Sequence, residues 1–150
     1  MDLSLDLLPY QNHLKVKVVE QQKKVFDPIR KKYYVWQPEE MVRQLLVQYL
    51  IQEAGYNKNR IHLERGIKVN GQAKRCDIII YDEATQPYLL IECKAPNISL
   101  DQKVLDQIAV YNMVFQVPFL LVSNGIQSFC CQMDYEHKSY TFLEKLPSPK

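Results

Sequence analysis

Residues 75–96 read RCDIIIYDEATQPYLLIECKAP, and this stretch decides the fold. Two runs rich in β-branched and aromatic residues flank the polar interval 83–86, a pattern typical of two antiparallel strands joined by a short loop. A further strand-like run, Ile61 to Val69, precedes them and ends at Asn70-Gly71, the strongest two-residue hairpin signal. The stretch and its approach therefore predict a three-stranded antiparallel meander.

Helices are expected on both sides of this meander. Apolar residues recur every three or four positions from Pro38 to Ala54 and again from Asp101 to Gln116. The apolar run Phe119 to Val122 is typical of a strand covered on both faces, and Ser128 to Met133 is its expected hairpin neighbour. A short strand near Tyr140 to Leu143 would close the sheet. We expect an α/β fold with a mixed sheet flanked by helices.

Length and composition bound the classes of protein. The chain has 150 residues, 47% of them hydrophobic, and a net charge of +2, which predicts one ordinary domain over residues 1–150 rather than a disordered or DNA-coating protein. Its core would cover about residues 38–133, after a basic and aromatic extension at 1–37. No glycine begins a phosphate-binding loop, so neither an ATP-driven motor nor a dinucleotide site is expected.

Apolar run lengths, the first residues and the cysteines bear on localisation and on zinc binding. The chain has no apolar run of membrane-spanning length and begins with acids where a signal peptide needs bases, which favours the cytoplasm. Four cysteines without an export signal are expected to be reduced, and none has a spacing typical of zinc ligands.

The register of the two central strands predicts a pair of carboxylates. If the loop is residues 83–86, Asp82 lies opposite Pro87 and Asp77 lies opposite Glu92. Side chains alternate along a strand, so Lys94 shares the face of Glu92.

The same register makes Cys76 and Cys93 face each other on the other side of the sheet. Two close carboxylates need a cation or a raised pKa, and oxygen ligands in an open cleft suit Mg²⁺ or Mn²⁺. A surface salt bridge fits the bare pattern about equally well, because the spacing of an acid two residues before a lysine occurs three times in the chain.

Basic residues gather in two segments, 15–32 and 58–75, each with a local charge of +5. For the first, a solvated segment is the favoured interpretation. The second could receive nucleic-acid phosphates near the metal site or be a solvated hairpin. The candidate phosphate contacts in the second segment are Arg65, Lys68, Lys74 and Arg75.

Four motifs in one order carry a family resemblance. They are PEEMVR at 38–43, KRCDI at 74–78, LIECKAP at 90–96 and DQIAVYN at 106–112. Together they resemble the N-terminal nuclease domain of type I restriction endonuclease R subunits, within the PD-(D/E)xK nuclease superfamily. The resemblance covers about residues 38–133 and implies a restriction-endonuclease-like core.

The resemblance implies roles for individual residues. Asp77 and Glu92 would be metal ligands, the carbonyl of Cys93 a third oxygen ligand and Lys94 the catalytic lysine. Glu40 matches the helical glutamate that often completes the site, although an acid in the first helical turn also favours the helix dipole.

Gln107 and Tyr111 match an element that helps to place DNA, although Tyr111 could equally be a core residue. Cys76 stands where the superfamily has its eponymous proline. The R subunit's motor is absent from these residues, so translocation and ATP dependence are not implied.

Two functional hypotheses remain. The first is a Mg²⁺-dependent (or Mn²⁺-dependent) DNA nuclease. The second is a non-cleaving DNA-binding or assembly module of the same fold that needs a partner subunit for motor or specificity. A small-molecule enzyme is the third, least favoured interpretation, because no cofactor motif is present.

Overall fold

The structure is a computed structural model that describes residues 3–69 and 71–150. Its elements, in chain order, are η1 (Leu8–His13), β1 (Val16–Val19), β2 (Gln22–Asp27), β3 (Lys32–Val35), α1 (Pro38–Gln52), η2 (Lys58–Arg60), β4 (Ile61–Val69), β5 (Gln72–Tyr81), β6 (Pro87–Cys93), α2 (Gln102–Asn112), η3 (Met113–Phe115), β7 (Phe119–Ser123), β8 (Ser128–Asp134) and β9 (Ser139–Leu143).

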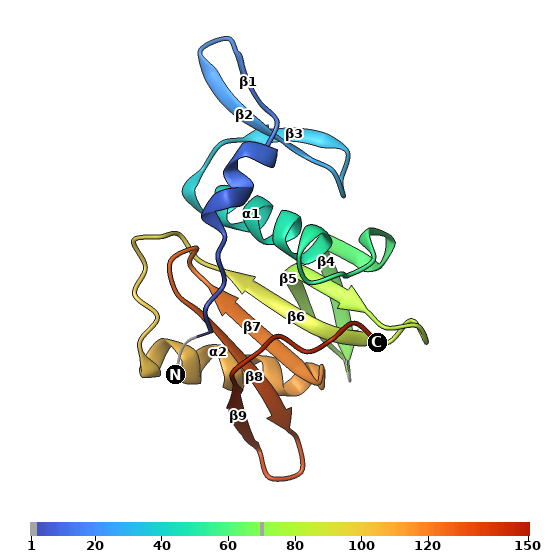
Figure 1. Cartoon of the computed structure of the whole chain (residues 1–150). Helices are drawn as coiled ribbons and strands as arrows, with labels where there is room; N and C mark the ends of the chain where they lie inside the picture. Colours follow the sequence, from blue (N-terminus) through green and yellow to red (C-terminus); the bar gives the residue numbers. More distant parts are fainter. Residues whose placement is uncertain (1–2, 70) are drawn as a thin grey trace.

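A six-stranded sheet in the order β4-β5-β6-β7-β8-β9 forms the centre of the molecule. β6 and β7 pair in parallel and all its other neighbours are antiparallel, so the predicted meander and mixed sheet are confirmed. Helix α1 covers one face and α2 the other (Figure 1). Within the described residues, no helix is both long and apolar enough to cross a membrane.

Both helices begin and pack as their sequences predict. α1 starts at Pro38, whose fixed φ suits the first helical position, and buries Leu45, Leu46 and Leu50 against the sheet. α2 is capped by Asp101, whose carboxylate accepts the N–H of Val104 at 2.9 Å. The apolar positions therefore determine which side of each helix faces the core.

The register of β5 and β6 agrees with the prediction in the centre and departs from it at the loop. Ile78 pairs with Ile91, Ile79 with Leu90 and Ile80 with Leu89, as expected. The expected pairing of Asp82 with Pro87 is wrong, because the register shifts after Ile80 and Tyr81 pairs with Pro87. An irregularity in the ladder thus lengthens the connecting loop without changing the central pairs.

The predicted facing of Cys76 and Cys93 is also wrong. Cys76 packs into the cluster on the α2 side of the sheet, and Cys93 into the cluster on the α1 side. The ladder between β4 and β5 is interrupted at this point: Glu64 has a φ of +55°, and no pair is formed between the Leu63–Ile78 pair and the Arg65–Cys76 pair. This break disturbs the alternation of β5 side chains on which the prediction depended.

The basic segment 15–32 is not a plain solvated segment. β1, β2 and β3 form a separate antiparallel three-stranded sheet beyond α1 (Figure 1). These three strands were not among the elements expected from the sequence. Lysines on these strands weaken the usual strand signal, which comes from alternating apolar residues.

The predicted Asn70-Gly71 turn includes Asn70, which lies outside the described residues. The strands on either side are paired up to Val69 and Gln72, and Gly71 has a φ of +79°. Such a backbone conformation favours glycine.

Candidate catalytic site

A cavity of about 480 Å³ opens between α2 and the ends of β5 and β6. The side chains around it come from both strands, the residue after β6, and one side of the helix. They are Lys74, Arg75, Glu92, Lys94, Gln107, Ile108, Tyr111 and Asn112. Six of these eight residues were candidates from the sequence, and the fold brings them to one place from three segments.

Glu92 is held by a lysine inside this cavity. Lys74 forms an ion pair with Glu92, donates a hydrogen bond to Asn112 Oδ1 at 2.9 Å and lies over the ring of Tyr111. Its side chain is only 7% exposed. Burial lowers the pKa of the Lys74 ammonium. Lys74 is therefore poorly placed for the exposed phosphate contact that was expected of it.

Asp77 lies beside the peptide that follows Glu92, yet faces a different cation. Its Oδ2 accepts the N–H of Cys93 at 2.8 Å, and its Oδ1 accepts a hydrogen bond from Arg43 of α1 at 3.0 Å. The Asp77 carboxylate thus turns toward α1, while the Glu92 carboxylate turns toward α2. The expectation that both acids and Lys94 share one face is wrong, because the alternation of β5 changes around Asp77, with Cys76 on the α2 side and Ile78 on the α1 side.

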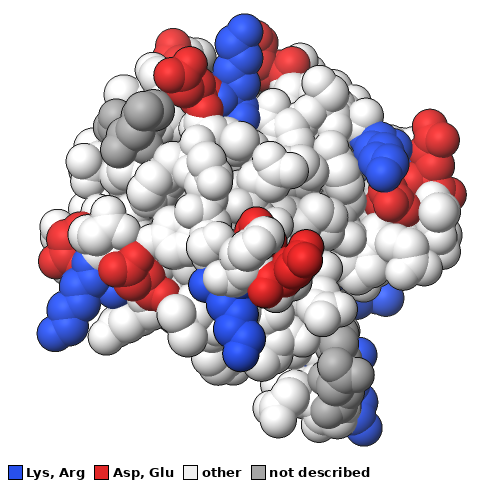
Figure 2. Space-filling view, turned by 90° about the horizontal axis from the view of Figure 1, so that it is seen from below, with Lys and Arg blue, Asp and Glu red and all other residues white. Residues whose placement is uncertain are grey.

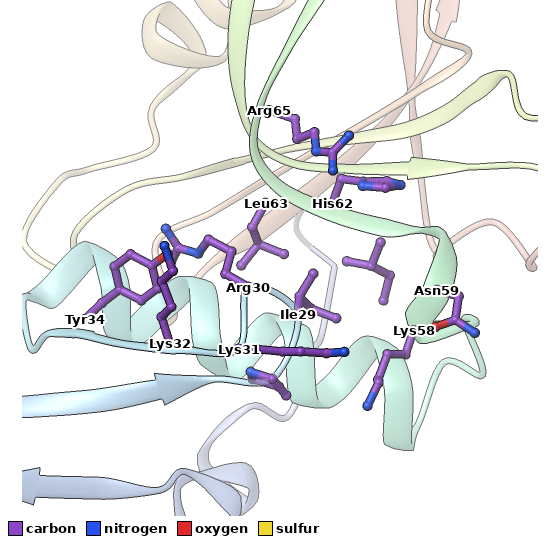
Figure 3. A pocket seen from close by; sticks show the side chains of 12 residues that line it. Ile29, Arg30, Lys31, Lys32, Tyr34, Lys58, Asn59, His62, Leu63 and Arg65 are labelled. Carbon is purple, nitrogen blue, oxygen red and sulfur yellow. The ribbon is translucent and has the colours of Figure 1, made fainter.

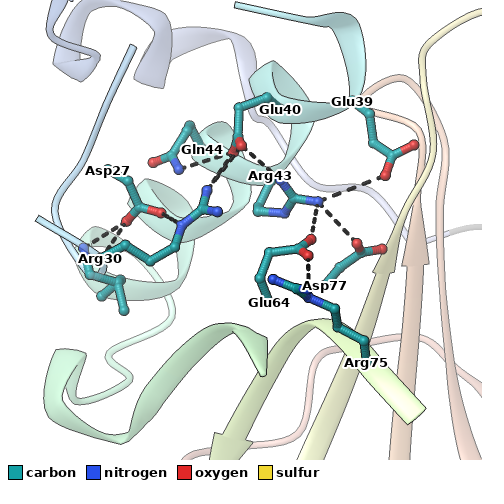
Figure 4. Close-up of polar contacts among 10 residues, drawn as sticks. Asp27, Arg30, Glu39, Glu40, Arg43, Gln44, Glu64, Arg75 and Asp77 are labelled. Atoms are coloured by element: carbon teal, nitrogen blue, oxygen red, sulfur yellow. Dashed lines mark hydrogen bonds and ion pairs between the residues drawn. The ribbon is translucent and has the colours of Figure 1, made fainter. Parts of the chain in front are cut away.

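Arg43 is the centre of a buried ion cluster on the α1 side (Figure 4). Its guanidinium contacts four carboxylates: Glu39 at 3.7 Å, Glu40 at 2.8 Å, Glu64 at 2.7 Å and Asp77 at 3.0 Å. Burial opposes the charge, but the surrounding acids raise the pKa of Arg43 above its ordinary value. The cluster ties α1 to β4 and β5.

Glu40 belongs to this cluster rather than to the cavity. Both of its oxygens accept hydrogen bonds from Arg30, one of them also contacts Arg43, and the other accepts a weaker bond from Gln44. The structure therefore does not bring Glu40 into one ligand set with Asp77 and Glu92, because two arginines occupy its carboxylate.

The remaining candidates spread over both sides of the cavity. Lys94 follows β6, and its backbone N–H donates to Ser123 O at 2.8 Å. Tyr111 is exposed on α2 next to Gln107, so it is not a core residue. Arg75 is exposed and forms an ion pair with Glu64 at 2.9 Å.

Arg65 and Lys68 are exposed on β4, outside this cavity. Figure 2 shows the molecule from below, where basic side chains stand next to acidic ones around a wide uncharged area.

A family model for the type I restriction enzyme R protein N terminus matches residues 38–147. The chain belongs to this family. Among solved structures, it is similar to a fragment described as an HsdR subunit of a type I restriction enzyme from Vibrio vulnificus YJ016, with a TM-score of 0.51 and 21% identity. The match covers 75% of this chain and 24% of that chain, so it concerns the fold of one part of a larger protein. A search of the curated proteins found no match.

The family match begins at the first residue of α1, so η1 and the β1–β3 sheet lie before it. It includes the cavity, Arg43 and the four carboxylates that Arg43 contacts, whereas Arg30, the second cation at Glu40, precedes it. The residues matched to the family therefore form the core, and the first sheet is additional to the matched residues.

The residues present suit a hard divalent cation by their chemistry. Asp77 and Glu92 supply carboxylate oxygens, and Mg²⁺ is usually bound through one or two carboxylates while it keeps several waters. No group of three or more His, Cys, Asp or Glu side chains within residues 3–69 and 71–150 is placed to hold a metal ion. To share one cation, these two carboxylates would have to release Arg43 and Lys74 and turn toward each other, and backbone or water oxygens would complete the ligand set.

Three side chains that contact the candidate site residues had no predicted role. Arg43 follows Glu39 and Glu40 at the spacings that place side chains on one helix face, so helical periodicity could have indicated it. Glu64 and Asn112 gave no such signal, because their partners Arg43 and Lys74 are distant in sequence and meet them only in the fold.

Proposed function

We propose that this chain is a Mg²⁺-dependent nuclease domain of the PD-(D/E)xK type, with a restriction-endonuclease-like core, that hydrolyses DNA phosphodiesters in a restriction-related role. One observation carries the proposal. Glu92, Lys94, Gln107 and Tyr111, which the family resemblance selected from distant positions, line a single cavity, and Asp77 hydrogen-bonds to the peptide that follows Glu92. A chance pattern of acids and lysines gives no reason for that convergence.

Each side chain has a distinct part in the proposed reaction. Asp77, Glu92 and the carbonyl of Cys93 would hold Mg²⁺ after the two carboxylates have released Arg43 and Lys74. When bound, Mg²⁺ stabilises negative charge and lowers the pKa of a bound water. The Lys94 ammonium would stabilise the charge that develops on the phosphate. Gln107 and Tyr111 are one helical turn apart on α2 and would position the DNA strand at the rim of the cavity.

Cleavage assays with matched variants test the proposal. Purified protein is incubated with supercoiled, linear and single-stranded DNA in Mg²⁺, Mn²⁺ or EDTA. We expect cleavage with metal only, and a loss of about 100-fold or more in Asp77→Asn and in Lys94→Ala. The control is Lys138→Ala, because Glu136-His137-Lys138 repeats the same spacing in the exposed turn between β8 and β9. Equal cleavage by wild type and Lys94→Ala would disprove the assignment.

The second candidate function is a DNA-binding or assembly module that acts only with a partner subunit. One observation favours it: both candidate ligand carboxylates are neutralised by basic side chains of the chain itself. Mobility shifts and Mn²⁺ titration calorimetry separate the two functions. DNA binding that persists in Asp77→Asn, with neither Mn²⁺ binding nor cleavage in the wild type, identifies the module.

A further inference from the structure

A second cavity, of about 490 Å³, lies between the turn that joins β2 to β3 and the segment formed by η2 and the start of β4 (Figure 3). The first side of the cavity precedes the family match and the second belongs to it. This cavity is thus built by the union of the additional sheet with the family core.

Positive charge dominates its lining. Six of the lining residues are basic and none is an Asp or Glu: Arg30, Lys31, Lys32, Lys58, His62 and Arg65. Arg30 is neutralised by Asp27 and Glu40. Within the described residues, the other four Lys and Arg side chains form no ion pair. Four uncompensated cations around one hollow favour an anionic ligand.

The backbone on one side of the cavity is held in place before any ligand arrives. Asp27 is fully buried, and one of its oxygens accepts the N–H groups of Ile29 at 2.7 Å and Arg30 at 3.0 Å. The N–H of Lys31, which has a φ of +58°, donates to the Asp27 carbonyl at 2.7 Å. These hydrogen bonds to Asp27 therefore fix the turn that carries Lys31 and Lys32.

The positive charge continues beyond the cavity along the first sheet. Lys17 lies over the ring of Tyr33 with its Nζ 3.8 Å from the centroid, and Lys23 lies over Trp36 at 4.1 Å. Lysines interleaved with aromatic rings suit a nucleic-acid strand, whose phosphates and bases alternate. A single small anion would fill the cavity and leave this line of charge unused.

We propose that the cavity and the β1–β3 sheet bind the phosphate backbone of a nucleic-acid strand, at a site separate from the candidate catalytic cavity. The choice of nucleic acid as ligand rests on the proposed function. The charge, the cavity and the fixed turn are independent of it. The additional sheet would then lengthen the contact of a small nuclease domain with its substrate.

Charge reversal with a matched control tests this site. Binding of a fluorescent 20-nucleotide single strand and of the corresponding duplex is measured by anisotropy in EDTA, with every protein in an Asp77→Asn background, so that cleavage plays no part. We expect the double variant Lys31→Glu with Lys58→Glu to bind about 10- to 100-fold more weakly and to show a shallower dependence of affinity on salt. A second variant, Lys32→Glu with Lys58→Glu, leaves the fixed turn residue Lys31 unchanged.

The control is Lys145→Glu with Lys150→Glu, which makes the same change of net charge at exposed residues of the C-terminal segment. Circular dichroism verifies that each variant is folded. Affinity equal to the wild type in both cavity variants, or equal losses in cavity and control variants, would overturn the proposal. An independent arm titrates inorganic pyrophosphate. If it binds the cavity and the oligonucleotide does not displace it, the site is for a small anion and the nucleic-acid assignment is wrong.

These outcomes are distinct from failure of the proposed nuclease. A wild-type protein that binds DNA through the cavity and cleaves nothing would retain this inference and lose the nuclease. If the wild type cleaves DNA and both cavity variants bind DNA as tightly as their parent protein, the nuclease is retained and this inference is lost.

Discussion

Two charged regions meet at Arg30, and they use their charges in opposite ways. In the Arg43 cluster, four carboxylates surround one buried guanidinium. Two further arginines offset the excess negative charge: Arg30 pairs with Glu40, and Arg75 pairs with Glu64. In the basic cavity, four cations face the same hollow without an acidic partner among the described residues. Charges paired within the fold hold its elements together, whereas charges left open to solvent are available to a ligand.

The largest expected effect comes from removing the centre of the paired region. Arg43→Met leaves Glu40, Glu64 and Asp77 with a buried or half-buried negative charge and no central cation. We expect the free energy of unfolding to fall by about 3–5 kcal/mol, because an uncompensated buried charge is costly. Urea denaturation followed by circular dichroism measures it.

The matched control for this experiment is Arg75→Met, the same substitution at a side chain that is 72% exposed. Its ion pair with Glu64 should contribute less than about 1 kcal/mol. Similar losses in the two variants would show that Arg43 does not organise the cluster.

A smaller effect is expected at the second paired carboxylate. Lys74→Met should cost about 2–3 kcal/mol of unfolding free energy, because it leaves Glu92 and Asn112 without their common donor. Adding Glu92→Gln should recover much of the loss, since it removes the unpaired charge. A double-mutant cycle in urea measures the coupling, and strictly additive losses would contradict the ion pair.

The smallest expected effect concerns His62 in the basic cavity. Burial, together with the positive charge of Arg65, lowers the pKa of the imidazole below its ordinary value of about 6.5. The unfolded chain therefore takes up this proton at higher pH than the folded chain, and stability should fall as pH drops through that ordinary value.

Titration of the His62 ring by NMR measures this pKa directly. Arg65→Gln should raise the midpoint toward the ordinary value, while burial and the edge-on contact with the Tyr81 ring remain. A midpoint at or above the ordinary value in the wild type would show that this cavity is less positive than its lining indicates.

Local patterns were sufficient for much of the fold. The helix spacing of apolar residues predicted α1. The assumed loop 83–86 predicted the central pairs of β5 and β6, although the pair that closes the loop was wrong. The β1–β3 sheet was missed because its strands carry lysines in place of a clean apolar alternation. The candidate catalytic residues were selected through the order of their motifs in the chain, which gave no indication of their ion-pair partners Arg43 and Lys74.

The sequence by itself determined which residue types stand at the ends of β5 and β6, since periodicity and motif spacing are local properties. Only the tertiary structure decided which cation each carboxylate meets. Arg43 reaches Asp77 across 34 positions, and Lys74 reaches Asn112 across 38. The ladder between β4 and β5 is interrupted where Glu64, in a left-handed conformation, lies opposite Asp77, and this depends on how two strands pair rather than on either strand alone. Contacts between distant segments are set by packing, and no local pattern records them.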